Sequence, residues 1–229
     1  AWELSEIDVA DFSECVQRTW EYCYDTYRPQ SFNASYTADR MKEVLSNFFV
    51  DSYVDSTPTH YYSGVGLKTL TCDKTDVAEV GFLGRTLLNA FNALEYGSLQ
   101  NRSELVKDAN NIFETYLSHG FSPAGFFNEV VSFHRDSKES NFSIRRQSEG
   151  VYAILSYLDY EKKHKRKHVE WEKRLKVILD NFLRIQKTDG SFPRKFKDDF
   201  SIVDSTGGST PSVTLPLVMA YKYFNDKRY

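Results

Sequence analysis

The stretch at 186–211, "QKTDGSFPRKFKDDFSIVDSTGGSTP", separates two runs of apolar residues that recur at helical spacing. Glycine, proline and charged residues dominate it, which is typical of a long connection between helices. Before it, 171–185 carries a single apolar stripe; after it, 213–224 is apolar on almost every face. The stretch therefore predicts a connection from a helix with one solvated face to a helix that is buried on all sides.

The same alternation occurs earlier in the chain. Segment 77–96 is apolar on nearly every face, 103–118 keeps one stripe, and 151–158 is apolar all round again. The turn "SPAGFF" at 122–127 aligns with "KTDGSF" at 187–192, an offset of 65 residues. This repetition predicts tandem helical hairpins, in which inner helices alternate with outer ones.

Two further helices are expected near the N-terminus. Apolar residues at 9–27 recur every three or four positions and stop before Pro29, and Thr37 caps a second helix that extends to Phe49. With about seven helices, the chain 1–229 is predicted to be a single all-α domain. Its long links all lead into inner helices, so they gather at one end of the array, where we expect the functional residues.

The composition limits the possible partners. The 229 residues carry 29 basic and 32 acidic side chains, a net charge of −3, which favours neither nucleic acid nor an acidic membrane surface as a partner. No apolar run reaches the ~18 residues of a membrane span. The three cysteines lack metal-ligand spacing and there is no glycine-rich phosphate loop, so neither a metal nor an organic cofactor is predicted. The basic run "EKKHKRKH" at 161–168 predicts a solvated turn between helices.

Three segments carry a resemblance to a known architecture: "IRRQSEGVYAILSYLDYE" at 144–161, "HVEWEKRLKVILDNFLRIQKTDGSFPRKF" at 168–196 and "STPSVTLPLVMAYKYFNDKRY" at 209–229. They resemble the α/α toroid of six-hairpin glycosidases, and more narrowly the helical core of uncharacterised bacterial carbohydrate-active proteins. The resemblance implies a partial toroid, since seven helices make fewer than six hairpins. It also implies that the chain is a portion of a longer protein, with the missing hairpins or a second copy covering its open ends.

The resemblance further implies an oligosaccharide or polysaccharide substrate, which favours a periplasmic or secreted location. Hydrolysis of a glycosidic bond needs two carboxylates that flank the bond. Glu149 and Asp204 are the expected pair, with Asp76 as a substitute partner, because all three fall at the end where the long links gather. Acidic residues near a helix start also stabilise its dipole, so a structural role stands beside the catalytic one.

Other residues at the same end are candidates for substrate binding. Arg145 and Arg146 can hold a carboxylate, and Phe192 offers an aromatic face to a sugar ring. Tyr62 and His134 are candidate bases for eliminative cleavage of a uronate. The sequence thus predicts a glycoside hydrolase domain acting on an acidic or complex glycan. A uronate polysaccharide lyase and a non-catalytic helical scaffold or glycan-binding domain are the alternatives.

Overall fold

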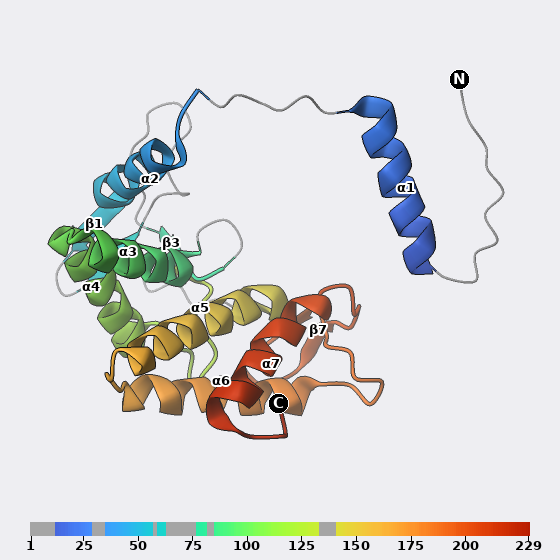
Figure 1. Ribbon diagram of the computed structural model, residues 1–229. Coiled ribbons are helices and arrows are strands. Elements are labelled where there is room, and N and C mark those ends of the chain that lie inside the picture. The colour runs from blue at the N-terminus through green and yellow to red at the C-terminus, as the bar shows by residue number, and fades with distance from the viewer. Residues whose placement is uncertain (1–11, 29–34, 57–58, 63–76, 82–84, 133–140) are drawn as a thin grey trace. The chain divides into compact units, whose positions relative to one another are not determined.

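The computed structural model describes residues 12–28, 35–56, 59–62, 77–81, 85–132 and 141–229 (Figure 1). The predicted site residues Asp76 and His134 lie outside these ranges. The chain divides into two compact units, Ala1–Met41 and Lys42–Tyr229.

The first unit contains helix α1, Phe12–Tyr27, which ends before Pro29 as predicted. Gln17 donates a hydrogen bond to Glu21, one helical turn further on. Helix α2, Ala38–Ser52, begins in this unit and continues into the second. The Thr37 hydroxyl accepts a hydrogen bond from the Arg40 amide at 3.2 Å, which confirms the predicted cap.

The second unit is mainly helical, which confirms the predicted all-α class. Helices α3 (Thr86–Gln100), α5 (Ile144–Lys163) and α7 (Pro211–Phe224) lie side by side in that order. Helix α4 (Ser103–His119) packs on α3, and α6 (Val169–Ile185) packs on α5 (Figure 1). The arrangement matches the alternation of inner and outer helices that the apolar pattern predicts.

Aromatic rings join the two layers. Phe113 of α4 stacks on Tyr157 of α5 with ring centres 4.0 Å apart, and it meets Trp171 of α6 edge-on at 6.3 Å. All three rings are buried, so they stabilise the contact by the hydrophobic effect as well as by ring geometry. The core therefore runs continuously between the two helical hairpins.

The predicted helix at 77–96 is partly wrong. Val77–Glu79 is a strand, β3, which pairs antiparallel with β4, Val130–Ser132, and α3 begins only at Thr86. A short apolar run fits a buried strand as well as a buried helix, so periodicity alone could not separate them. The structure also adds an antiparallel hairpin, β1 (Tyr53–Ser56) and β2 (Thr59–Tyr62), where the sequence predicted only a link.

Backbone pairing and hydrogen bonds join the α4–α5 link to the α6–α7 link near the start of α5. Strands β5 (Phe142–Ser143), β6 (Lys195–Phe196) and β7 (Ile202–Asp204) form one antiparallel sheet in that order. The Asp198 carboxylate accepts a hydrogen bond from the Ala124 amide at 3.2 Å, which joins the α6–α7 link to the α4–α5 link. The predicted clustering of these two links at one end of the helices is therefore confirmed.

The aligned turns "SPAGFF" and "KTDGSF" have the same backbone form. Gly125 (φ 92°) and Gly190 (φ 82°) both adopt a left-handed conformation, and each donates its amide to the carbonyl three residues earlier, at 2.9 Å. Phe200 (φ 69°) repeats the turn without a glycine. The repeat predicted from the sequence is thus a structural repeat.

Pro211 is the first residue of α7, and the side chain of the preceding Thr210 does not cap the helix. The Thr210 hydroxyl instead accepts a hydrogen bond from the Phe192 amide at 3.0 Å, which holds the α6–α7 link together. In the described ranges, no helix combines the length and apolar character needed to cross a membrane.

Candidate functional site

A polar cavity of about 340 Å³ lies where α5 begins, beside the β5–β6–β7 sheet. Its lining comes from the α4–α5 link, the first turn of α5 and the α6–α7 link: Glu129, Asn141, Phe142, Ser143, Arg145, Arg146, Arg194, Lys195 and Ser209. Four of these side chains are cationic, and one is a carboxylate. The lining therefore favours anionic ligands.

The one carboxylate in the lining is buried and fixed. Glu129 is 1% exposed, and it accepts hydrogen bonds from the Ser143 amide and from the Gln147 side chain, the latter at 3.1 Å. Its other oxygen lies 3.6 Å from a guanidinium nitrogen of Arg146. A buried carboxylate is costly unless it is paired in this way. Glu129 therefore holds the first turn of α5, and Arg146 with it, in one position.

Gln147 and Gly150 hold the α4–α5 link against α5. The fully buried Gln147 amide group exchanges two hydrogen bonds with the backbone of Phe127, at 2.9 and 2.8 Å. A Cβ atom on Gly150 would lie 2.8 Å from the Phe127 ring and 3.0 Å from Val80. Only glycine permits so close an approach, and this side of the cavity is therefore set by tight packing.

Glu149 lies on the next turn of α5, between two arginines. Its carboxylate is 3.1 Å from Arg145 and 3.6 Å from Arg85, which directly precedes α3. The segment after β3 also packs here, because a Cβ on Gly81 would lie 2.8 Å from the backbone of Arg146 and 3.1 Å from the Glu149 carboxylate. The start of α3, the end of β3 and the start of α5 thus meet at Glu149.

Asp204 ends β7 on the other side of the sheet from β5. Hydrogen bonds from the Thr206 hydroxyl (2.6 Å) and amide (3.0 Å) hold the pKa of Asp204 below its usual range, with help from Arg194 at 3.5 Å. The same turn occurs at Asp189 and Asp199, which bond to the serines two residues on. What distinguishes Asp204 is its contact with an arginine that lines the cavity.

The structure brings several predicted residues to one place. Arg145 and Arg146 line the cavity, and Glu149 and Asp204 each form an ion pair with an arginine of its lining. Phe192, in contrast, is 3% exposed and packs edge-on against Phe182, so its ring belongs to the core.

Three predicted residues are not placed at the cavity. The backbone of Tyr62 pairs with Tyr53 in the β1–β2 hairpin, which packs on α4, and its side chain is outside the described part of the structure. Asp76 and His134 are outside it entirely. The roles assigned to these residues remain predictions.

Sequence reasoning missed four charged residues of the site: Arg85, Glu129, Arg194 and Lys195. Arg194 and Lys195 could have been proposed as site residues, because they form the "RK" pair in the middle of the long link at 186–211. Glu129 could not, since a single glutamate in a link gives no indication that packing will bury it.

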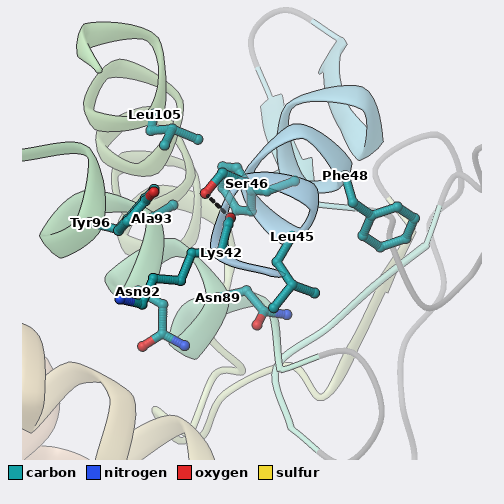
Figure 2. A pocket seen from close by; sticks show the side chains of 10 residues that line it. Lys42, Leu45, Ser46, Phe48, Asn89, Asn92, Ala93, Tyr96 and Leu105 are labelled. Atoms are coloured by element: carbon teal, nitrogen blue, oxygen red, sulfur yellow. Dashed lines mark hydrogen bonds between the residues drawn. The ribbon is translucent and has the colours of Figure 1, made fainter. Parts of the chain in front are cut away.

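A second cavity of about 310 Å³ lies between α2 and α3 (Figure 2). Figure 2 shows Lys42 and Ser46 of α2 on the side of Ala93 and Tyr96 of α3, Leu45 beside Asn89, and the Phe48 ring directed away from α3. Among the described residues of its lining, Lys42 is the one with a charged side chain. In the described ranges, no cluster of three or more His, Cys, Asp or Glu side chains has the geometry of a metal site.

At the C-terminal end of α5, residues 162–167 are exposed, as the prediction of a solvated basic turn requires, whereas Glu161 and His168 at its two ends are not. The Glu161 side chain is 5% exposed and accepts hydrogen bonds from Arg166 and from His168, each at 2.7 Å. Burial opposes ionisation of Glu161, but these hydrogen bonds outweigh it and lower its pKa. His168 also contacts the Tyr157 hydroxyl at 3.0 Å, so it is bound rather than solvated.

A third cavity, of about 440 Å³, lies beside this network. It is lined by Lys162, Lys165, Arg166, Lys167, Glu172, Tyr223 and Phe224. Its cations all come from the turn between α5 and α6 and from the last turn of α5. They are neighbours in the sequence, unlike those at the start of α5.

No known protein family matches the chain, and no curated protein matches it. Among solved structures, a D-mannose isomerase is similar with a TM-score of 0.59 and 12% identity over 87% of this chain and 50% of that protein. An alpha-amylase from Clostridium perfringens has a TM-score of 0.45 and 11% identity over 66% of this chain and 42% of that one. The chain thus spans about half the length of these proteins. The likeness to the isomerase shows a shared fold.

Proposed function

We propose that this chain is the sugar-processing part of a carbohydrate-active enzyme and hydrolyses glycosidic bonds at the cavity where α5 begins. One observation carries the proposal. Glu149 and Asp204 are far apart in the sequence, yet each is ion-paired to an arginine that lines the same cavity. Two carboxylates beside one substrate-sized space are what glycosidic hydrolysis requires.

The two carboxylates have different roles in this proposal. Asp204 has a lowered pKa and stays ionised, so it serves as the base that removes a proton from water, or as the nucleophile. Glu149 donates the proton to the leaving glycosidic oxygen as the bond to the anomeric carbon breaks. Arg145 and Arg146 bind the sugar, and Asp76 remains the substitute partner for either carboxylate. One water is consumed for each bond cleaved.

The shared fold supports the substrate class. The similar solved structure is named an isomerase of D-mannose, a sugar, and this is consistent with a carbohydrate substrate for the present chain. The choice of hydrolysis over isomerisation rests on the two carboxylates that pair with arginines of the cavity lining.

The test is mass spectrometry of acidic and neutral oligosaccharides after incubation with the protein in its longest natural form. Hydrolysis predicts products that together gain the mass of one water per cut. Cleavage without this gain would contradict hydrolysis in favour of elimination. Conversion of D-mannose to a ketose in a parallel incubation, detected by chromatography because the two isomers have the same mass, would replace it with isomerisation if every glycosidic bond stayed intact. A folded sample that leaves the whole panel unchanged would also overturn the proposal.

A further inference from the structure

The charges around the cavity do not balance. Among the described side chains that line it or pair with a residue of its lining, four are cations and three are carboxylates: Arg145, Arg146, Arg194 and Lys195 against Glu129, Glu149 and Asp204. Among these described groups, positive charges exceed negative ones by one. An anion in the cavity would compensate this excess.

The cations of the cavity wall are held in place by contacts with neighbouring parts of the fold. The buried Glu129 carboxylate lies beside Arg146, and the carbonyl of Arg194 accepts a hydrogen bond from the Ile144 amide at 3.2 Å. Lys195 pairs with Ser143 on one side and Asp204 on the other within the sheet. A wall arranged before the ligand arrives lowers the entropic cost of binding.

Lys195 contributes most directly to the excess charge. Within the described part of the chain it forms no ion pair with a carboxylate, although it lines the cavity. The nearby Arg194 is partly neutralised by Asp204 at 3.5 Å. Lys195 is thus available to a ligand without breaking an existing ion pair.

We infer that this cavity binds the anionic group of an acidic sugar, a carboxylate or a phosphate, between Arg146, Arg194 and Lys195. Guanidinium groups pair with both kinds of oxyanion through parallel hydrogen bonds, and a lysine adds a mobile point charge. Asn141 and Ser209 in the same lining offer polar groups to the sugar hydroxyls. The inference rests on the proposed function for the sugar, and on the cavity's own charge for its acidity.

The test is a titration by ligand-observed NMR at low salt with D-glucuronate, D-glucose 6-phosphate and D-glucose. The wild-type protein should bind at least one of the two acidic sugars roughly tenfold more tightly than glucose, and added salt should reduce this preference. The better of the two acidic ligands identifies the anionic group. Lys195→Gln should lower acidic-sugar affinity about fivefold and leave glucose unaffected.

Lys197→Gln is the matched control. Lys197 lies two residues further along, is exposed, and is not part of the cavity lining, so its affinity change should stay within about twofold. Equal binding of acidic and neutral sugars, equal effects of the two variants, or no binding of any sugar would overturn the inference. Selective binding without cleavage of any glycan would contradict only hydrolysis. Cleavage of neutral glycans without acidic preference would contradict only the inference.

Discussion

The two ends of α5 both carry a cation-lined cavity, but the cations are assembled in different ways. At the N-terminal end, Arg145 and Arg146 of the helix meet Arg194 and Lys195 of a distant link. At the C-terminal end, all the lining cations fall within 162–167. The first cluster exists only in the folded chain, whereas the second is already present as a run in the sequence.

The helix dipole stabilises the cations of the second cluster and disfavours the arginines of the first. Cations in the last turn of a helix, such as Lys162 and Lys163 of α5, are stabilised by the helix dipole, and Arg166 is also paired with Glu161. The first turn of α5 has no acidic residue; it carries arginines, which the dipole disfavours. Ion pairs with Glu149 and Glu129 offset this cost for Arg145 and Arg146, and the proposed anionic ligand would offset it further.

The largest expected effect is on catalysis at the N-terminal end. Glu149→Gln should lower turnover about 10²- to 10⁴-fold, because the variant cannot protonate the leaving oxygen. Glu170→Gln is the control, since Glu170 is an exposed residue of α6 that pairs with Lys173 three residues further along the same helix. Initial rates on the cleaved glycan and circular dichroism of both variants provide the measurement. Equal rates for the two variants would remove Glu149 from the mechanism.

A second prediction concerns the packing that positions Glu149. Gly81→Ala should destabilise the protein by about 1–3 kcal/mol and lower turnover, because the new Cβ meets the Arg146 backbone at 2.8 Å. Gly208→Ala is the control, since a Cβ there meets nothing within 4 Å. Urea unfolding should place the control within about 0.5 kcal/mol of wild type. If Gly81→Ala changed neither the free energy of unfolding nor turnover, this close contact would not position the site.

At the C-terminal end the expected effect is on stability. Glu161→Gln should destabilise the fold by about 1–3 kcal/mol at pH 7, because it weakens the hydrogen bonds to Arg166 and His168. The pKa of Glu161 is lower in the folded protein than the ordinary pKa of a glutamate, so its stabilisation is fully present above that ordinary value and is lost as pH falls through the folded pKa.

The difference in unfolding free energy between wild type and Glu161→Gln should therefore shrink when the pH is lowered from 6 to 3. Denaturant unfolding at both pH values measures it. A difference that grows on acidification would contradict the assigned ionisation of Glu161. Acidic-sugar affinity at pH 7 should be unchanged in this variant, since Glu161 does not line the cavity at the start of α5.

The smallest effect is expected from the exposed lysines of the basic run. The double variant Lys165→Gln/Lys167→Gln removes two charges from the cavity at the C-terminal end of α5. Affinity for the acidic sugar should change by less than about twofold, because these charges lie at the far end of a 20-residue helix from the proposed site. A loss as large as that of Lys195→Gln would show that net charge, rather than the convergent site, controls binding.

The sequence predicted the parts of the fold that depend on local pattern. Helical periodicity located α4 to α7, and the aligned glycines at Gly125 and Gly190 identified the repeated turn. The strand β3 was mistaken for helix because its short apolar run pairs with a strand from a distant link. Pairing of that kind leaves no periodic signal.

The candidate site was only half predictable for the same reason. Arg145, Arg146 and Glu149 stand together in "RRQSE" and could be proposed from their place before an inner helix. Glu129 could not, since its burial depends on how the α4–α5 link packs against α5. Lys195 reaches the site only because β6 pairs with β5 beside the first turn of α5, and this pairing could not be predicted from the sequence.

The most direct test of the central claim is a crystal structure of the protein with a bound digalacturonate. We expect one carboxylate between Arg146, Arg194 and Lys195, and the glycosidic oxygen between the carboxylates of Glu149 and Asp204. A ligand bound instead among the lysines at the C-terminal end of α5, or with its glycosidic oxygen remote from both carboxylates, would contradict the assignment of the site.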